Sequence, residues 1–132
     1  MAIEYNNQPI TNVYYKDGTV YSNESSVLGT IKTMIGPSES YEGFDLDLIT
    51  HINSILMYLY DIGAVKKGTR ITSDHETWST ILEGNKNIEG IKSLIYIRCK
   101  LMFDPPANAT MVKTLQDEAN RLEWYILMEC DK

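Results

Sequence analysis

The sequence predicts an all-α protein, a small bundle of about five helices with an N-terminal β-hairpin extension. Apolar residues recur at helical spacing after residue 25, and glycine or proline follows most of these periodic runs. Residues 1–25 differ, because they are rich in Tyr, Asn and Thr and poor in aliphatic residues. We therefore divide the chain into an N-terminal extension at 1–25 and a helical domain at 26–132.

The N-terminal extension contains the turn signal of a β-hairpin. Asp17-Gly18 lies between VYYK and TVYS, and both residues tolerate the positive φ angles of a two-residue type I′ turn. In that register Tyr15 would face Val20 and Tyr14 would face Tyr21. Because an isolated two-stranded hairpin is only marginally stable in water, we expect it to dock on another surface, with Tyr14 and Tyr21 as candidate contact residues.

Two helices are expected in the first half of the helical domain. Ser25 or Ser26 can cap the first, and the Gly-Pro dipeptide at 36–37 ends it. The second helix spans about residues 43–62, where the apolar residues form one broad stripe and aspartates lie near the N-terminus. Gly63 ends this second helix.

A third, short helix is expected after a capping box. The sequence SDHE at 73–76 places Ser and Glu three residues apart, the spacing at which each side chain accepts a free backbone N–H at a helix start. This helix would carry Trp78, Ile81 and Leu82 and would end at Gly84.

The last two helices are expected to form an antiparallel pair. The first, at about 86–103, is apolar around nearly its whole circumference, which is typical of a central helix. A corner follows, because proline lacks the N–H that continues a helix and disfavours helical backbone at the residue before it. The corner residues are Asp104, Pro105 and Pro106. Asn108 or a neighbouring residue then caps a helix at about 107–129, which folds back on the central one.

Two groups of residues are candidates for contact with another molecule. Three apolar side chains fall outside the helical stripes: Met57, Trp124 and Met128. They indicate either a wider core or an interface with another chain, and the sequence does not decide between the two. The polar loop after the second helix carries three basic residues: Lys66, Lys67 and Arg70. They indicate either a solvated turn or a contact with an acidic partner.

Reactive residue types occur without the partners that catalysis or metal binding needs. His51 follows Asp47 by four residues, which fits an ordinary ion pair on a helix better than an oriented general base. His75 lies in the capping box without metal-ligand spacing. Cys99 and Cys130 lie in apolar helical patterns, which favours free thiols in a reducing cytosol. The sequence therefore predicts neither an enzyme nor a metal or cofactor site.

Charge and hydropathy argue against two further classes. Twelve Lys and Arg against eighteen Asp and Glu give a net charge of -6, which disfavours a surface that grips nucleic-acid phosphates over a wide area. No secretory leader is recognised, and the apolar runs are shorter than the ~20 residues that span a bilayer. We therefore expect a soluble protein, with no membrane contact, that DNA can pass without being bound.

Three stretches together resemble one known family: FDLDLITHINSILMYLYDIGA at 44–64, ITSDHETWSTIL at 71–82, and IKSLIYIRCKLMFDPPANATMVKTLQDEANRLEWYI at 91–126. The HIN and LYDIGA of the long helix, the TW of the short helix, the LMFDPP corner and the terminal LEW are similar to the head-tail connector, or adaptor, proteins of long-tailed bacteriophages. The resemblance covers about residues 26–129, and its motifs occur in order, which makes it more specific than any single motif.

The resemblance implies a small, helical, non-enzymatic virion protein without a cofactor. Such proteins assemble as a ring, usually twelve-fold, beneath the portal protein, and extend the DNA channel to the stopper or tail-completion proteins. DNA would then pass during packaging and ejection without sequence-specific binding. The implied location is the head-tail junction of the virion, reached after assembly in the host cytoplasm. The residues alone leave open a second class, a small phage-encoded regulator in the cytosol that binds a protein partner through the same helices.

Overall fold

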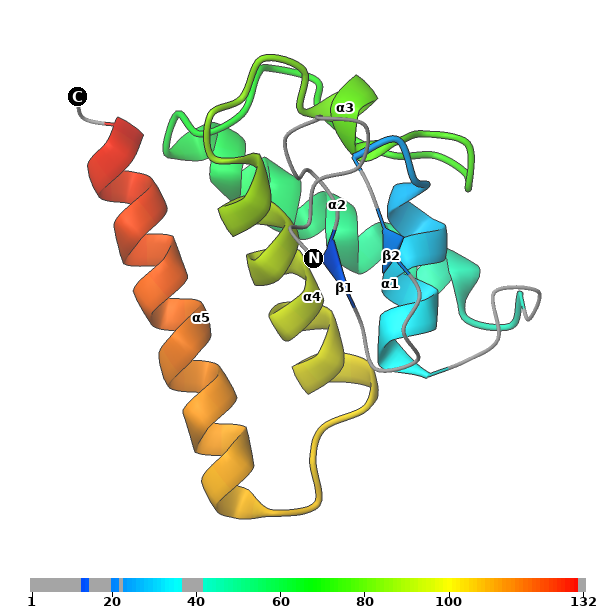
Figure 1. Cartoon of the computed structure of the whole chain (residues 1–132), viewed down its shortest axis with the longest axis vertical. Helices are drawn as coiled ribbons and strands as arrows, with labels where there is room; N and C mark the ends of the chain where they lie inside the picture. Colours follow the sequence, from blue (N-terminus) through cyan, green and yellow to red (C-terminus); the bar gives the residue numbers. More distant parts are fainter. Residues whose placement is uncertain (1–12, 15–19, 22, 37–41, 131–132) are drawn as a thin grey trace, which may run out of the picture.

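The computed structural model describes residues 23–36 and 42–130, together with the backbone of residues 13–14 and 20–21. Within the helical domain so described, the all-α prediction is confirmed, with the expected five helices (Figure 1). The helices are α1 Val27–Ile35, α2 Asp45–Asp61, α3 Trp78–Ile81, α4 Ile88–Phe103 and α5 Ala109–Cys130.

Helix α4 is central, as its apolar circumference predicted. It packs against α1 and α2 with one part of its surface and against α5 with another (Figure 1). Its buried residues therefore lie on several sides of the helix: Ile91, Lys92, Leu94, Ile95, Ile97 and Cys99. Helices α1 and α2 also contact each other, so that α1, α2 and α4 enclose the main core, and α5 covers α4 from the outside.

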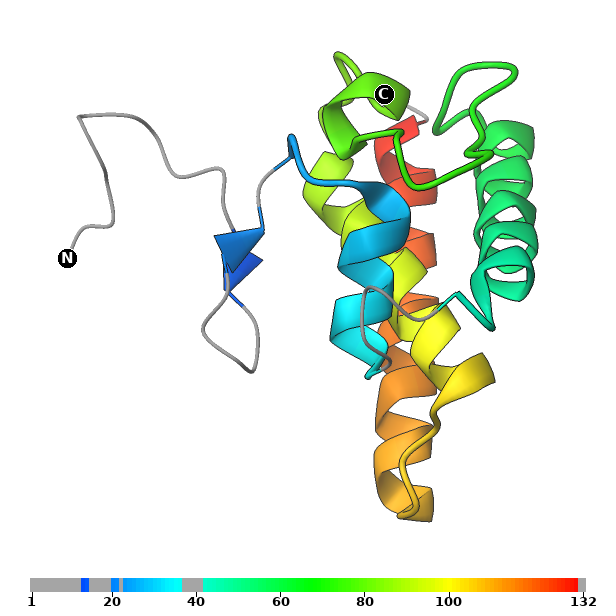
Figure 2. The same ribbon diagram turned by 90° about the vertical axis from the view of Figure 1, so that its right-hand side faces the viewer.

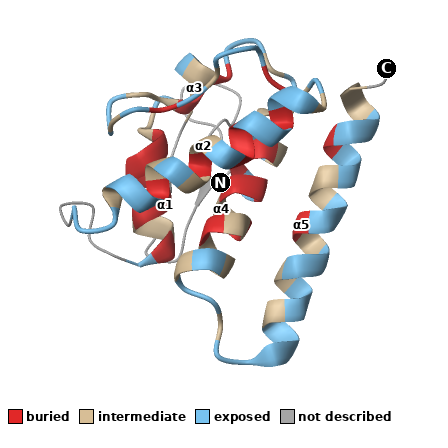
Figure 3. Cartoon of the chain, turned by 180° about the vertical axis from the view of Figure 1, so that it is seen from behind, coloured by how far each residue is buried: buried red, intermediate tan, exposed pale blue. Residues whose placement is uncertain are grey.

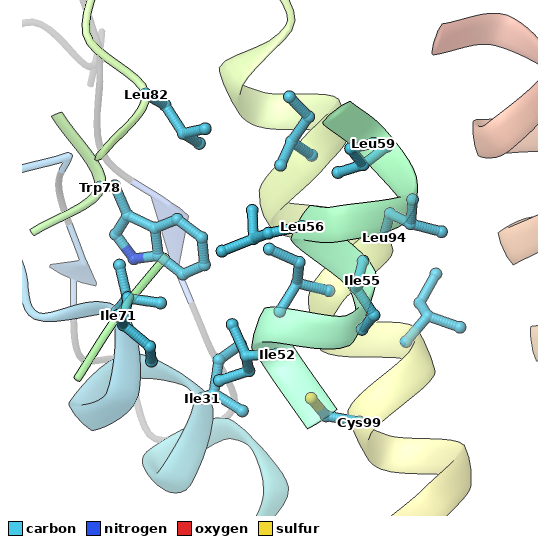
Figure 4. Close-up of a cluster of buried hydrophobic side chains, with 14 of the residues drawn as sticks. Ile31, Ile52, Ile55, Leu56, Leu59, Ile71, Trp78, Leu82, Leu94 and Cys99 are labelled. Carbon is cyan, nitrogen blue, oxygen red and sulfur yellow. The ribbon is translucent and has the colours of Figure 1, made fainter. Parts of the chain in front are cut away.

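The short helix α3 contributes the largest side chain of the core. Trp78 is fully buried and lies beside Leu56 of α2 and Ile71 of the preceding loop (Figure 4). Its indole Nε1 donates a hydrogen bond of 3.3 Å to Oγ1 of Thr30 in α1. Because a buried indole N–H needs an acceptor, this bond lets the whole ring enter the core without an unsatisfied donor.

The segment before α1 is bound to the segment that starts α3. Three backbone hydrogen bonds join them, from Val27 N to Glu76 O at 2.9 Å, from Trp78 N to Ser25 O at 3.3 Å and from Ser79 N to Asn23 O at 2.7 Å. The chain from residue 23 onward is therefore part of the helical domain, although it precedes the first helix.

A buried lysine of α4, Lys92, contacts both the segment before α1 and the start of α3. The Lys92 ammonium donates a 3.0 Å hydrogen bond to Oδ1 of Asn23 and lies 5.7 Å from the centre of the Trp78 ring. Burial lowers the pKa of Lys92, and the nearby Glu89 carboxylate opposes that shift. An ammonium group in such a place is stabilised by its hydrogen bond and by the negative face of the indole.

The predicted capping box at Ser73 and Glu76 does not start α3. The Glu76 carboxylate accepts backbone N–H groups of Thr72 at 2.8 Å and of Ser73 at 3.1 Å, and so closes the loop in front of the helix. Helix α3 begins at Trp78 and is capped by Thr77, whose backbone is extended with φ -102° and ψ 163°. The motif was correctly recognised as a local hydrogen-bonding unit, but the helix start was placed too early.

The corner after α4 is confirmed. Asp104 leaves the helical region with φ -153° and ψ 59°, and its carboxylate lies 3.0 Å from the ammonium of Lys100, one turn earlier. Asn108 caps the next helix as predicted, since its Oδ1 accepts the N–H of Thr110 at 2.7 Å and of Met111 at 3.2 Å.

After the corner, α5 returns antiparallel to α4. At the end of the pair that is far from the corner, Gly90 of α4 lies close to Ile126 of α5, since a Cβ atom added at Gly90 would be 3.9 Å from Cγ1 of Ile126. Closer to the corner, Nη2 of Arg98 lies 2.6 Å from Oε2 of Glu123. Residues later in α4 therefore face residues earlier in α5, as the predicted antiparallel pair requires (Figure 1).

Two short strands, β1 Val13–Tyr14 and β2 Val20–Tyr21, pair antiparallel ahead of the helical domain. Tyr14 lies opposite Val20, so the predicted register, which placed it opposite Tyr21, is wrong by one residue. Strands this short specify their register weakly, and one residue of slip exchanges the two faces. The predicted turn lies outside the described residues, so the hairpin as a whole stays a prediction. Figure 2 shows both strands to one side of the helices.

We expect Ile126→Ala to lower the free energy of unfolding by about 2–5 kcal/mol, because a fully buried side chain is lost where α5 meets α4. The matched control is Leu127→Ala, which removes an isomeric side chain that is 37% exposed and should cost less than about 1.5 kcal/mol. Urea unfolding followed by circular dichroism measures both changes. Equal losses in the two variants would contradict the one-sided packing of α5.

The Glu76 loop predicts a defined pH dependence. Partial burial raises the pKa of this carboxyl, but the hydrogen bonds from Thr72 and Ser73 outweigh it and bring the pKa from 4.5 to about 2. The ionised form therefore stabilises the fold above pH 4.5, and this contribution is lost as the pH falls towards 2.

We expect Glu76→Gln to lower the melting temperature at pH 7 and to differ progressively less from the parent protein between pH 4.5 and pH 2. Thermal unfolding over that range tests this, with Glu83→Gln, an exposed glutamate after α3, as the control. A difference between parent and Glu76→Gln that stays constant with pH would refute the role given to the Glu76 carboxylate.

Candidate interaction surface

Helix α5 is packed on one narrow face. Only Ala119 and Ile126 of its 22 residues are buried. Figure 3 shows the consequence, a long helix most of whose residues are coloured as exposed or intermediate. Helix α5 thus gains its place in the fold mainly from contact with α4, and its outer surface is available for other contacts.

The exposed side of the C-terminal half of α5 is rich in apolar residues. It carries four large apolar side chains, which we call the α5 patch: Trp124, Tyr125, Leu127 and Met128. Trp124 alone is 62% exposed. Since residues of an α-helix are about 100° apart, these four cover the half of the helix opposite Ala119 and Ile126.

This half of α5 therefore carries large apolar residues on both its inner and its outer side. Leu122 and Ile126 face the bundle, and the α5 patch faces away from it. Large apolar side chains on the outer side of a helix are stabilised when another molecule covers them. The chain alone covers one side, so the α5 patch has the character of a surface that is completed by another molecule.

A second exposed apolar surface lies on α2. Three side chains on one side of this helix form the α2 patch: Leu46, Met57 and Tyr60. Leu46 is 75% exposed and Met57 is 62% exposed. They are eleven residues apart, about three helical turns, so they lie on nearly the same side of α2.

The basic loop borders the α2 patch at its C-terminal end. Asn53 lies on the same side of α2. Its Nδ2 donates a hydrogen bond to Ile71 O, and its Oδ1 accepts one from Ile71 N, each with a length of 2.8 Å. This bidentate contact holds the loop that follows α2 against the helix. The loop carries three exposed basic side chains, which no ion pair joins to another described residue: Lys66, Lys67 and Arg70.

The structure places the predicted contact residues as follows. Met57, Trp124 and Met128 are exposed, so the alternative of a wider core is wrong for these three. The side chains of Tyr14 and Tyr21 lie outside the described residues. Sequence reasoning missed four members of the two patches: Leu46, Tyr60, Tyr125 and Leu127. A count of apolar residues on both sides of the last helix, along LEWYILM, would have found two of them.

The reactive side chains are not arranged for catalysis. The His51 ring packs edge-on against Phe103 at 5.8 Å and 77°, and no hydrogen bond joins it to Asp47 within the described chain. His75 is exposed beside Ser73. Burial raises the pKa of the Cys99 thiol to about 12, which keeps it protonated and unreactive. Nowhere in the described ranges do three His, Cys, Asp or Glu side chains gather as metal ligands would.

One apolar pocket of about 350 Å³ lies where the ends of α1, α2 and α4 approach one another. Its lining is nearly all apolar: Ile35, Gly36, Phe44, Leu48, Phe103 and, at one edge, Asp104. The Asp104 carboxylate is already paired with Lys100. A pocket of this kind has room for an apolar group and offers no nucleophile or acid-base pair.

The family comparison decides the class of the chain. A family model described as phage connector protein matches residues 27–132, which include all five helices. The chain belongs to the phage connector protein family. The resemblance to head-tail connectors is thereby confirmed, and with it a connector role in general. The match begins at the first residue of α1, after the β-strands.

Two further observations complete the comparison. Searches of curated proteins and of solved structures found no match to the connector. None of its helices within the described ranges has the length and apolar character of a bilayer span.

Proposed function

We propose that this connector assembles as a ring beneath the portal protein and extends the DNA channel towards the stopper or tail-completion proteins. The observation that carries this proposal is the α5 patch, which exposes four large apolar side chains on the side of α5 that faces away from the bundle. A monomer that functions alone gains nothing from four large exposed apolar side chains on one helix. A subunit of an assembly needs such a surface.

A ring also requires two different contact surfaces on each copy. In a heterologous interface, one patch meets another patch on the next copy, and the assembly closes when the rotation returns to the start. The connector has two such surfaces, the α5 patch and the α2 patch, on separate helices. We take the number of copies, twelve, from the family resemblance alone.

The charge of the chain suits a channel through which DNA moves. Binding of DNA phosphates needs a concentration of Lys and Arg, and this chain has a net charge of -6. A ring of such subunits repels the DNA backbone and does not bind a particular sequence. The connector is in this proposal a structural component of the virion at the head-tail junction, without catalytic activity or cofactor.

The N-terminal extension is proposed to contact the portal or a neighbouring copy. Strands β1 and β2 stand to one side of the helices (Figure 2), and two strands without further cover are marginally stable. Docking on a second molecule would supply the missing cover, with Tyr14 and Tyr21 as the proposed contact residues.

Ring formation is tested by adding the purified connector to isolated portal and viewing the complex by negative-stain electron microscopy. We expect a ring of density below the portal for the parent protein. Trp124→Ala should reduce the affinity with which the connector forms this ring by about 2 kcal/mol or more, roughly 30-fold, because Trp residues that become buried in interfaces are frequent hot spots. Sedimentation velocity measures the affinity.

The matched control is Met111→Ala, which removes an exposed apolar residue from the other end of α5. Both variants should keep the melting temperature of the parent protein, since both side chains lie outside the core. Undiminished association of Trp124→Ala with itself and with portal would remove Trp124 from the interface. The absence of any added ring with the parent protein would overturn the proposed function.

Removal of residues 1–22 should leave the helical domain folded, because it keeps the backbone hydrogen bonds that join Asn23, Ser25 and Val27 to the start of α3. We expect an unchanged melting temperature but reduced incorporation of the connector into particles, measured by mass spectrometry of purified virions. Normal incorporation of the truncated chain would count against docking of the extension. Deletion that extends to residue 26 serves as a contrast, since it should destabilise the fold.

A further inference from the structure

We propose that the subunit interface of the ring is formed by the α5 patch of one copy and the α2 patch, with its basic border, of the next copy. This proposal rests on the proposed ring and names the two surfaces that meet in it. In this interface, Leu46, Met57 and Tyr60 of one copy contact Trp124 and Met128 of the neighbouring copy.

The first argument is the distribution of exposed apolar side chains. Among the described residues, five large ones lie on α2 or its N-cap, five lie on α5, and one, Met102, lies near the end of α4. Helices α2 and α5 both pack on α4, but on different sides of it (Figures 1 and 3). Each copy therefore presents two separate apolar surfaces that face different directions, as a heterologous interface requires.

The second argument is charge complementarity at the border of the two patches. The C-terminal end of a helix carries a partial negative charge, and the last turn of α5 contains no basic residue. The α2 patch ends beside the loop that carries Lys66, Lys67 and Arg70, all exposed. A contact between the two patches brings the negative end of α5 within reach of this positive loop.

The third argument excludes the simplest competing interface. If α5 patches of two copies met each other, the contact would be symmetric and would close at two copies. It would bring two negative helix ends into one interface and would leave the α2 patch uncovered. A contact between α5 and α2 covers both patches and leads from each copy to the next.

Cysteine cross-linking on assembled rings tests the proposal. In a Cys130→Ser background, Met57→Cys and Met128→Cys each place one reactive thiol in one patch, while Cys99 stays buried with its pKa raised to about 12. Two populations, each with one of these substitutions, are mixed, assembled on isolated portal and treated with a short bis-maleimide. We expect a covalent dimer from the mixture and none from either population alone.

The chain that carries both substitutions extends the test. A heterologous interface should link it into a ladder of dimers, trimers and larger species, whereas a symmetric interface stops at dimers. Met111→Cys paired with Met57→Cys is the matched control, because Met111 is exposed on α5 but lies outside the α5 patch. That pair should give no cross-link.

The outcomes separate this interface from the function on which it rests. Cross-linking of Met128→Cys to itself, or to portal only, would overturn the proposed interface and leave the ring in place. A ring of density on the portal without a cross-link between Met57→Cys and Met128→Cys chains would also overturn the proposed interface. No ring of density on portal would overturn the proposed function, and this interface with it.

Discussion

The structure depends on the burial of α4 from both sides. Its apolar residues lie around most of its circumference, so a single neighbouring layer cannot cover them. Helices α1 and α2 cover one side, and the chain must then return along the other side to complete the cover. The corner at 104–106 makes this return possible within a few residues, since proline stops α4 and Asn108 starts α5 at once. Helix α5 therefore mainly covers α4, and its exposed apolar side is a direct consequence.

Polar contacts at the edge of the core fix how the covering elements are placed. Lys32 of α1 lies 2.8 Å from Asp45 in the first turn of α2, and Arg98 of α4 pairs with Glu123 of α5. Lys92 holds the segment before α1 through Asn23. Buried or half-buried ion pairs add little net stability, because both partners lose water. The two ion pairs are costly to break, however, so they and the Lys92–Asn23 hydrogen bond disfavour other arrangements of these elements.

The sequence predicts those parts of the fold that are decided locally. Ser26 and Asn108 cap their helices as expected, and the glycines at 36, 63 and 84 take the positive φ angles that follow the first three helices. The Glu76 motif was placed at the wrong helix start because its carboxylate can bind the amides of a loop as well as those of a helix. The register of β1 and β2 was missed because strands of two residues specify their pairing weakly. Leu46 and Tyr60 of the α2 patch were missed for a different reason, since their exposure depends on which side of α2 remains uncovered once the chain has packed.

The small size of the two patches limits the affinity between copies, so the proposed ring needs a template on which to form. Each patch is a few side chains wide, and copies with a net charge of -6 repel one another in solution. A small apolar interface between chains of like charge has a low affinity, so few copies are bound to one another at low concentration. A portal that binds several copies side by side raises their effective concentration to the millimolar range, at which even weak contacts are occupied. In the proposed ring, the partial exposure of α5 is then a compromise, because a small patch binds weakly between free chains and still provides the contact that closes the ring once a template has gathered the subunits.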